Sequence, residues 1–339
     1  MADRKLHEAM LYKKGEEASC DCFLCAHRCH IKPGKRGVCR VRENREGTLY
    51  SLVYGMLIAA HVDPIEKKPL YHFLPGSRSF SIATIGCNFR CDFCQNWQIS
   101  QAAREEEIAG EYTAPEEVVR TAKSHRCPSI SYTYTEPTIY FEYAHDCARL
   151  AKAEGIRNNF VTNGYQTPET IEKMAGLIDA ANVDLKAFND AFYRERCKAR
   201  LNPVCEAIRL MHKAGIHVEV TTLLIPGYND DPVELKQLAE FLASVSVDMP
   251  WHVSRYHPDY KFDHAPVTPA EIIFRALEVG KQAGLRYIYA GNLPAEDYEN
   301  THCPGCGTTV IERVGFSARL VGLEGAKCKK CGTILPLIL

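Results

Sequence analysis

Long apolar segments are missing from this sequence. No stretch of the 339 residues approaches the run of about 18 apolar residues that a membrane-spanning helix needs. The opening MADRKLHEAMLYKKGEEASC also lacks the apolar core of a secretory signal peptide. We therefore expect no membrane association and a cytoplasmic location. In that compartment clustered cysteines bind metal more often than they form disulfides.

An excess of charge of either sign is missing as well. The 41 Lys and Arg residues against 42 Asp and Glu residues leave a formal net charge of −1. A generally basic nucleic-acid binder is disfavoured, although a local basic patch stays open, so nucleic-acid binding is undecided. The hydrophobic content of 46% and charged content of 24% are ordinary for a globular protein, and the length suits one large core with smaller appendages.

Cysteine, by contrast, is abundant. Twelve of the 16 cysteines fall in three tight groups. These groups are Cys20, Cys22, Cys25, Cys29 and Cys39; Cys87, Cys91 and Cys94; and Cys303, Cys306, Cys328 and Cys331. The other four are scattered, and we expect them to be buried as small apolar side chains. They are Cys127, Cys147, Cys197 and Cys205.

Short β-branched or aromatic runs alternate with helical stretches between residues 79 and 290. The runs are 79–86, 129–135, 158–163, 181–187, 217–225, 251–256 and 286–290. Most are too apolar for half-exposed strands, as expected of a parallel sheet covered on both faces. Four segments place a capping Thr or Asp ahead of a proline and predict helix starts. They are 113–116, 167–170, 231–234 and 268–271. The helices at 140–155 and 202–215 are expected to end at Gly155 and Gly215.

This order predicts an α/β fold in which the parallel sheet curls into a partial (β/α)6-type barrel. We expect an N-terminal cysteine-rich module, a lead-in strand and loop, the barrel, and a zinc-ribbon-like C-terminal module. Their ranges are 1–50, 51–78, 79–295 and 296–339. Chemistry in such barrels lies at the C-terminal ends of the strands. The sequence places GCNFRC, YTEP, TNG, DLK and IPG at those ends.

Cys87, Cys91 and Cys94 form a C-x3-C-x2-C motif on the loop after the first barrel strand. Three thiolates can hold three irons of a [4Fe–4S] cluster and leave the fourth iron open to another ligand. The alternative is a zinc site that borrows a distant fourth ligand. Structural zinc sites usually use paired C-x2-C arms, so three cysteines in one loop favour the cluster.

With Phe93 before the last cysteine, this loop resembles the radical S-adenosylmethionine (SAM) superfamily. The resemblance implies that the open iron chelates the amino and carboxylate groups of SAM. Reductive cleavage would then release a 5′-deoxyadenosyl radical that abstracts hydrogen from a substrate. An external electron donor of the flavodoxin or ferredoxin kind is implied too.

Later segments resemble the glycyl-radical activase branch of that superfamily. In YTYTEP (132–137), Glu136 and Pro137 match a GGEP segment that contacts the methionine amino group, whereas Tyr134 and Thr135 replace its glycines. The resemblance implies SAM or substrate contacts at six positions. These are Thr135, Glu136, Thr162, Asn163, Asp184 and Lys186. For the last two, a buried ion pair or a helix cap is the alternative.

Two further segments suggest contacts with adenosine and with substrate. A Gly turn in LLIPGYND (223–230) resembles the fifth-strand segment of the same branch, where it approaches the adenosine. The sixth strand's end concentrates polar and aromatic side chains that make a plausible substrate surface. These are His252, Arg255, Tyr256, His257 and Tyr260. Tyr256 and the neighbouring Trp251 are alternatively core residues.

The resemblance extends over nearly the whole chain. DPIEKKPLYHFLPGS followed by CNFRCDFCQNWQIS, and HPDYK followed by YIYAGN, look like the radical enzyme of the three-protein AmmeMemoRadiSam system, a relative of pyruvate formate-lyase activase. The partners implied are the other proteins of that system or a glycyl-radical enzyme.

The terminal cysteine groups predict two more metal sites. CPGC (303–306) and CKKC (328–331) form the paired knuckles of a zinc ribbon, and we favour structural zinc; an iron–sulfur site or a rubredoxin-like iron stays open. At the other end, Cys22, Cys25, Cys29 and Cys39 suit a four-thiolate site, either zinc or an auxiliary iron–sulfur cluster. Cys20 is then spare, and His27 and His30 are nearby substitutes.

The favoured function is therefore a radical SAM enzyme. Within this class the chain is either a glycyl-radical enzyme activase proper or an enzyme that modifies a small molecule, RNA or peptide. The alternative from another class is a non-catalytic, metal-stabilised scaffold that binds nucleic acid or protein. The zinc-ribbon-like cysteine pattern of the chain supports that alternative, whereas the near-zero net charge of the chain does not.

Overall fold

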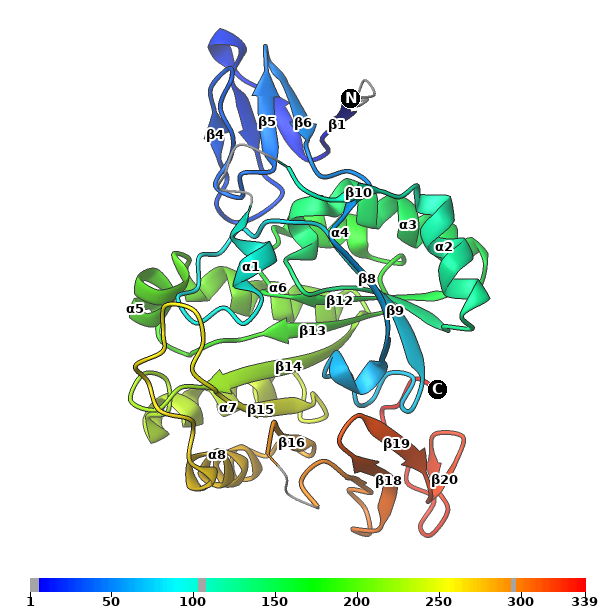
Figure 1. Cartoon of the computed structure of the whole chain (residues 1–339). Helices are drawn as coiled ribbons and strands as arrows, with labels where there is room; N and C mark the ends of the chain where they lie inside the picture. The colour runs from blue at the N-terminus through cyan, green and yellow to red at the C-terminus, as the bar shows by residue number, and fades with distance from the viewer. Residues whose placement is uncertain (1–5, 103–107, 294–296) are drawn as a thin grey trace.

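The computed structural model describes residues 6–102, 108–293 and 297–339, in which one curved sheet is the central element (Figure 1). Eight strands pair in the order β16-β15-β14-β13-β12-β11-β9-β8. Their bounds are β8 Ala59–Pro64, β9 Arg78–Ala83, β11 Ser129–Tyr132, β12 Arg157–Thr162, β13 Ala180–Asp184, β14 His217–Leu224, β15 Trp251–Arg255 and β16 Ile288–Gly291. Strand β8 is antiparallel to β9, and the other neighbouring pairs are parallel. Within the described residues β8 and β16 do not pair, so the sheet stays open, as in a partial barrel.

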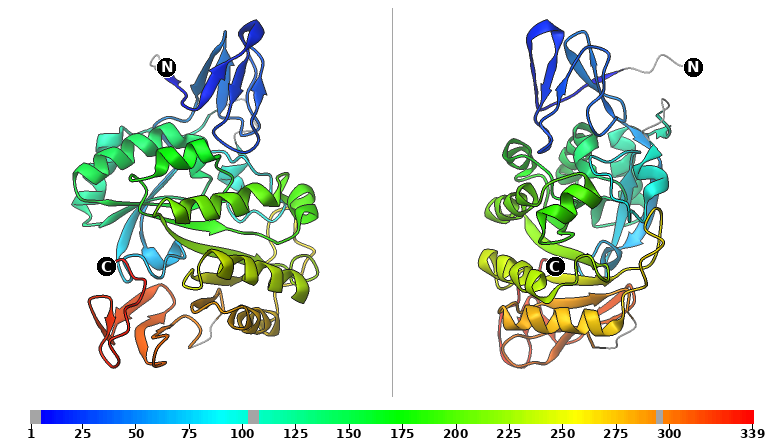
Figure 2. Two further views of the ribbon diagram at one scale, coloured as in Figure 1. Left: turned by 180° about the vertical axis from the view of Figure 1, so that it is seen from behind. Right: turned by 90° about the vertical axis from the view of Figure 1, so that its left-hand side faces the viewer.

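Helical connections join each parallel strand to the next and cover one face of the sheet (Figure 2). The long helices are α2 Pro115–Ser124, α3 Phe141–Ala153, α4 Pro168–Met174, α6 Leu201–Lys213, α7 Pro232–Val245 and α8 Ala270–Gln282. The short elements are the α-helices α1 Trp97–Ser100 and α5 Asp190–Phe192, the 3-10 helices η1 Glu16–Ala18, η2 Ile65–Lys67 and η4 Pro137–Tyr140, and a π-helical turn at Tyr193–Cys197. No helix in the described ranges is long and apolar enough to cross a bilayer.

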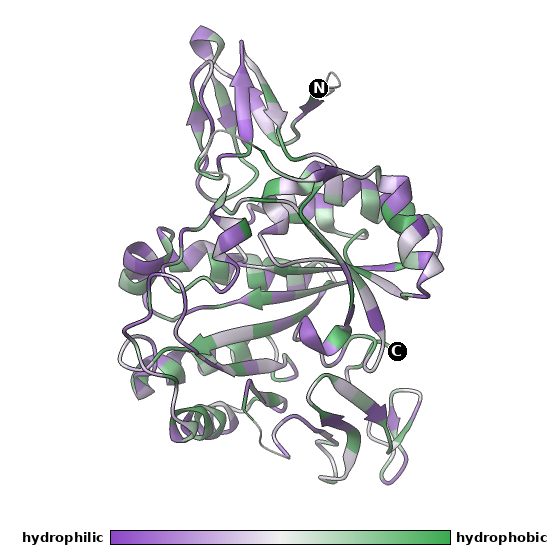
Figure 3. Cartoon of the chain, viewed as in Figure 1, coloured by the Kyte–Doolittle hydropathy of each residue, from purple (hydrophilic) through white to green (hydrophobic). Residues whose placement is uncertain are grey.

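The predicted α/β fold is confirmed. Each of the seven predicted runs overlaps one of the observed parallel strands, and no strand extends more than one residue beyond its run. The strand interiors are buried; every residue of β11 is buried, for example. Figure 3 shows apolar residues along the strands and mixed polarity along the helices. A strand buried on both faces has no polar side to mark it, which is why continuous apolar runs were the useful signal.

Two of the four predicted caps are confirmed. Thr167 accepts a hydrogen bond from Thr170 N at the start of α4, and Asp231 accepts bonds from the first turn of α7. The predicted caps at 113–116 and 268–271 are wrong. The N-cap positions of α2 and α8 are occupied by Ala114 and Pro269, which make no side-chain hydrogen bond to the helix. The Thr268 hydroxyl instead donates to Leu224 O (2.6 Å), a buried carbonyl at the end of β14.

Both predicted C-terminal glycines are confirmed. Helices α3 and α6 end just before Gly155 and Gly215. These residues have φ values of +73° and +79°, a conformation that glycine adopts without strain.

The N-terminal segment forms two small antiparallel sheets that lie beside α3 and α4 (Figure 1). One contains β1 His7–Glu8, β6 Thr48–Ser51 and β5 Arg42–Arg45; the other contains β2 Tyr12–Lys14, β3 Cys20–Cys22 and β4 His30–Ile31. Strands β7 Met56–Leu57 and β10 Glu111–Tyr112 form a separate pair. Leu24, Val41 and Leu49 belong to the same buried apolar cluster as the barrel. The segment is therefore packed onto the barrel rather than loosely tethered.

The C-terminal segment packs against the β16 edge of the sheet. Its strands are β17 Thr301–His302, β18 Thr309–Val314, β19 Ser317–Leu320, β20 Leu323–Glu324 and β21 Lys327–Cys328. Val310 and Ile311 share a buried cluster with Tyr71, Tyr287 and Tyr289 of the barrel. This shared cluster makes the C-terminal strands part of the same folded unit as that edge of the sheet.

Arg313 on β18 is the polar centre of this contact. Its side chain is fully buried beside that of Glu66. The guanidinium donates to Tyr71 O (2.7 Å) and Thr301 Oγ1 (2.7 Å) and lies 4.1 Å from the centre of the Tyr71 ring. Removing the guanidinium would leave these buried groups without a partner.

We expect Arg313→Ala to lower the free energy of unfolding by about 3–5 kcal/mol, because breaking a buried ionic contact leaves uncompensated polar groups behind. Urea unfolding measures the change. Arg319→Ala is the matched control, since Arg319 pairs with Glu312 at the exposed face of the same hairpin. It should unfold close to the wild type. Equal stability of the two variants would contradict the anchoring role of Arg313.

Candidate active site

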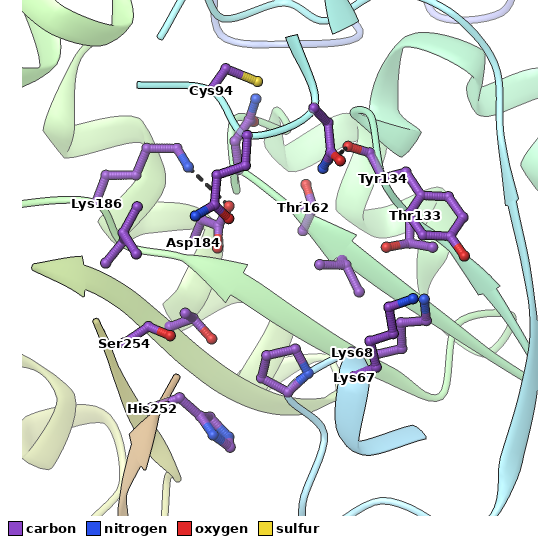
Figure 4. Close-up of a pocket in the computed structure, with 18 of the residues that line it drawn as sticks. Lys67, Lys68, Cys94, Thr133, Tyr134, Thr162, Asp184, Lys186, His252 and Ser254 are labelled. Carbon is purple, nitrogen blue, oxygen red and sulfur yellow. Dashed lines mark hydrogen bonds and ion pairs between the residues drawn. The ribbon is translucent and has the colours of Figure 1, made fainter. Parts of the chain in front are cut away.

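A cavity of about 580 Å³ lies at the C-terminal ends of the parallel strands (Figure 4). Because the strands run in one direction, the segments that follow them meet at one edge of the sheet. All nine residues predicted for cluster or SAM contacts line this cavity. They are Cys87, Cys91, Cys94, Thr135, Glu136, Thr162, Asn163, Asp184 and Lys186. The structure therefore brings together residues that are up to 99 positions apart in sequence (87 to 186).

The cysteine loop follows β9 and turns at Gly86, whose φ of +101° is one that other residues rarely adopt. Cys87 Sγ accepts hydrogen bonds from Phe89 N (3.3 Å) and Asn163 Nδ2 (3.8 Å). Cys94 Sγ lies 3.2 Å from the Ser100 hydroxyl. Hydrogen-bond donors around sulfur are typical of thiolates that ligate iron. Burial raises the pKa of the Cys87 thiol, so its thiolate needs a nearby cation. These residues fit a cluster.

Cys197 supports the loop from a distant part of the sequence. It is fully buried, as expected, but its thiol also lies next to that of Cys91 and lowers the pKa of Cys91. Its carbonyl accepts a hydrogen bond from Arg90 N (3.0 Å). The π-helical turn that ends at Cys197 thus holds the middle of the cysteine loop. No local pattern marks Cys197, because its spacing from Cys91 is set only by the fold.

Glu136 connects the ends of β11 and β12. Its buried carboxylate accepts hydrogen bonds from Thr162 Oγ1 (2.7 Å) and Asn163 N (2.8 Å). Burial raises the pKa of Glu136, and these hydrogen bonds oppose the shift. Asn163 in turn donates to Asn88 Oδ1 in the cysteine loop (2.7 Å). Glu136 therefore positions the TNG segment against the cysteine loop; its predicted contact with methionine stays a prediction.

Asp184 and Lys186 form an ion pair of 2.9 Å at the end of β13, and both line the cavity. Burial lowers the pKa of Lys186, but the charges of Asp184 and Cys91 outweigh burial and raise it well above the usual value. The ammonium, 5.8 Å from the centre of the Phe93 ring, therefore stays charged. The pair is thus available to a zwitterionic ligand as well as being structural.

The predicted substrate surface on β15 is largely corrected. His252 and Ser254 line the cavity. His252 Nε2 is hydrogen-bonded to the buried Glu219 carboxylate (2.7 Å). The other predicted members do not line the cavity. Tyr256 and the adjacent Trp251 are core residues, Arg255 donates to Thr268 O, Tyr260 stacks on Trp97, and His257 is exposed. Side chains on a strand alternate in direction, so one segment cannot present all of them to one cavity.

Other predicted contacts are also revised. The Gly227 turn of IPG does not line the cavity, whereas Thr221 and Leu223 on the preceding strand do. The C-terminal segment supplies two further wall residues, Glu299 and Phe316, which the motifs did not indicate.

The four C-terminal cysteines meet as predicted. Their sulfur atoms all lie within 4.8 Å of one another. Cys303 and Cys331 are 3.5 Å apart and Cys306 and Cys328 are 3.7 Å apart. A tetrahedral zinc with Zn–S bonds of about 2.3 Å separates its sulfurs by about 3.8 Å. The donor set and spacing fit a closed structural site.

The N-terminal cysteines form a looser group. Burial raises the pKa of Cys25, and the neighbouring charges of Cys22, Cys39 and Cys29 add to the shift, so these four are close together. Among the described residues, only the C-terminal cysteines form a group of three or more possible metal ligands whose ligand atoms all lie within 4.8 Å of one another. Arg42 Nη1 donates to Cys22 Sγ (3.0 Å).

The possible histidine substitutes have other partners. His27 is hydrogen-bonded to Asn88 O (2.8 Å), and His30 pairs with Asp21 at the surface. Since Asn88 belongs to the cysteine loop, His27 also connects the N-terminal segment to that loop. The two histidines are thus less available as metal ligands than the four cysteines.

Comparisons with known proteins agree with this geometry. Residues 81–240 match the Radical SAM superfamily. The chain belongs to this superfamily. It is 44% identical over 337 residues to an uncharacterized protein of Methanocaldococcus jannaschii, covering 98% of this chain and 100% of that one. It is 22% identical over 218 residues to the pyruvate formate-lyase 1-activating enzyme of Escherichia coli, covering 60% of this chain and 89% of that enzyme.

Solved structures share the fold. Streptococcus suis SuiB bound to S-adenosylmethionine superposes with a TM-score of 0.51 and 15% identity, covering 67% of this chain and 53% of that chain. A radical SAM methyltransferase from Sphaerobacter thermophilus superposes with a TM-score of 0.50 and 19% identity, covering 64% of this chain and 67% of that chain. At this identity the likeness concerns the fold alone. The [4Fe–4S] cluster and SAM are implied by the match to the Radical SAM superfamily and not by the shared fold.

We predict that Cys197→Ala retains the iron content of the reconstituted protein, because Cys197 supports a ligand rather than acting as one. Cys94→Ala should lose cluster iron. Iron analysis together with the visible absorption spectrum separates the two cases. Iron loss in a well-folded Cys197→Ala protein would make Cys197 a fourth ligand and contradict the assignment.

We predict that Cys328→Ala loses one tightly bound zinc per chain without loss of iron, because a tetrahedral site with three thiolates is incomplete. Elemental analysis of both metals measures this. Cys205→Ala, a buried cysteine on α6, is the control and should keep both. Iron instead of zinc in the wild-type C-terminal site would contradict the zinc assignment.

Proposed function

We propose that this chain is a radical SAM enzyme that reductively cleaves SAM at a [4Fe–4S] cluster and uses the resulting 5′-deoxyadenosyl radical to abstract hydrogen from a substrate. The observation that carries the proposal is the convergence of Cys87, Cys91 and Cys94 with polar residues at the ends of β11, β12 and β13 on one cavity. A purely structural metal site would not need a cavity, nor an open coordination position.

The residues have distinct roles in this proposal. Cys87, Cys91 and Cys94 would hold the cluster, which supplies, when bound, the electron that cleaves SAM. The charged pair Asp184–Lys186 is suited to the carboxylate and amino groups of a bound methionine moiety, because it presents both signs of charge at the cavity wall. Glu136 and Thr162 keep the β11 and β12 ends in register, with Thr135 and Asn163 as further contacts.

Part of the cavity wall is itself buried. Tyr71 and His252 are 6% and 3% exposed, and both line the cavity. Such buried walls favour radical chemistry, because side reactions with solvent are suppressed where a site is closed. An electron donor of the flavodoxin or ferredoxin kind would deliver the electron from outside.

The domain division and the accessory metals belong to the same proposal. Residues 1–50, 51–78, 79–295 and 296–339 would be the N-terminal module, the lead-in, the core and the C-terminal module. We assign structural zinc to the C-terminal cysteines and leave zinc or an auxiliary iron–sulfur cluster as alternatives for Cys22, Cys25, Cys29 and Cys39. The cytoplasmic location stays a prediction from the sequence.

Two kinds of substrate remain. The similarity to the Escherichia coli activating enzyme supports a glycyl-radical enzyme as the partner. The resemblance to the AmmeMemoRadiSam radical enzyme supports a different substrate and the partner proteins of that system. The C-terminal segment forms part of the cavity wall through Glu299 and Phe316, which a core barrel alone lacks. This favours a substrate other than a glycyl-radical enzyme. A non-catalytic scaffold has less support, since its binding function would leave the cavity unexplained.

Anaerobic reconstitution with iron and sulfide, followed by SAM and a strong reductant, tests the function. We expect 5′-deoxyadenosine to form, and Cys91→Ala to abolish its formation. Cys127→Ala is the control, because this buried cysteine precedes β11 at the opposite edge of the sheet. It should retain activity. Absence of 5′-deoxyadenosine from cluster-loaded wild-type protein, or its formation by Cys91→Ala, would contradict the proposal.

A further inference from the structure

Two lysines line the cavity on a different side from the cysteine loop. Lys67 is the last residue of η2, the short 3-10 helix after β8, and Lys68 follows it directly. Figure 4 shows both side chains extending together along the cavity wall toward Tyr134, away from Cys94. The cluster and SAM residues proposed above do not include them.

The two ammonium groups share one carboxylate. Lys67 Nζ donates to Asp63 Oδ1 (2.9 Å), and Lys68 Nζ donates to Asp63 Oδ2 (2.7 Å). The Tyr134 hydroxyl donates to Oδ2 as well. Two positive charges against one negative charge leave a net positive charge at this wall. Three donors thus occupy most of the acceptor capacity of the Asp63 carboxylate.

Each ammonium keeps unused donors. An ammonium has three N–H groups, and Asp63 is the one hydrogen-bond partner of the Lys67 and Lys68 ammonium groups within the described residues. The Lys68 side chain is only 2% exposed, so its remaining donors meet the cavity rather than open solvent. Burial lowers the pKa of Lys68 to about 8, and the Lys67 charge adds to this although Asp63 opposes it. A second anion would compensate the buried charge.

Tyr134 orders this lysine pair at a cost to the backbone. Its φ of +62° lies in the left-handed region, where glycine is unstrained and tyrosine is not. Its ring lies 4.4 Å from Lys68 Nζ, and its hydroxyl holds Asp63. Strained backbone of this kind is concentrated at functional sites. The side chain thus has a use that glycine would not provide.

We propose that Lys67 and Lys68 bind the oxyanion group, a carboxylate or a phosphate, of a small-molecule substrate. The inference rests on the proposed function, because it identifies the substrate of that same cavity. Val161, Leu223 and Ser254 also line the cavity, and they suit a short, largely apolar body. The abstracted hydrogen belongs to that body, at a distance from the oxyanion. The substrate is therefore an organic acid or a phosphate ester.

Calorimetric titration of the full-length protein tests this. The protein is reconstituted anaerobically with its cluster and saturated with SAM, without reductant, so that the methionine carboxylate does not compete as a free ligand. Inorganic phosphate and succinate are titrated separately, and the tighter binder identifies the oxyanion. We expect saturable binding that Lys68→Gln weakens at least about tenfold, because a charge-assisted hydrogen bond is lost.

Lys67→Gln is the second variant, because its side chain is 46% exposed and its removal does not threaten folding. It should weaken the same titration even if Lys68→Gln proves unstable in thermal unfolding. Lys123→Gln is the matched control, an exposed lysine on α2 that pairs with Glu154. It should bind like the wild type.

Two results overturn the inference: no saturable binding of either anion, or binding by Lys67→Gln and Lys68→Gln equal to that of the wild type. The titration is independent of SAM cleavage. Lysine-dependent binding without any 5′-deoxyadenosine formation contradicts the proposed function and leaves the anion site in place. Active enzyme without lysine-dependent binding contradicts this inference alone.

Discussion

The candidate site depends on the parallel hydrogen-bond ladder of the central sheet. The registers pair Thr162 with Val183, and Asp184 with Thr221, so that successive strand ends finish side by side. The segments that carry Cys87, Glu136, Asn163 and Lys186 all leave the sheet at this edge. The two lysines on the other side of the cavity instead follow the antiparallel strand β8. The cavity is therefore a consequence of topology before it is a consequence of any single residue.

Buried arginines attach both cysteine-rich segments to this barrel. Arg42 pairs with the buried Glu142 of α3 and also reaches Cys22, while Arg313 lies beside Glu66. In each case a guanidinium with several donors satisfies buried groups from two segments at once. The cysteine-rich segments are thus parts of the same folded unit, and the C-terminal one contributes to the cavity wall. This integration is why the terminal cysteines are unsuited to the role of detachable binding modules.

The two sides of the cavity have different chemistry. One side carries thiols together with the charged pair at the end of β13, which suits a metal cluster and a zwitterionic ligand. The other side carries ammonium groups held by Asp63 and Tyr134, which suits an anion. In the proposed function, the first side would generate the reactive species and the second would hold the substrate in place.

The sequence by itself determined the elements and the metal-binding motifs. The apolar runs, Thr167, Asp231 and the three cysteine groups are local patterns, and local patterns depend on neighbours along the chain. The sequence did not reveal that Cys197 lies beside Cys91. It did not reveal that Thr268 donates a hydrogen bond to Leu224 O instead of capping α8. Nor did it show that His252 would line the cavity while other residues near the end of β15 would not. Nor did it indicate that Lys67 and Lys68 share Asp63 on the cavity wall. Only the tertiary structure decided these, because contact between distant residues is set by strand order, register and side-chain direction.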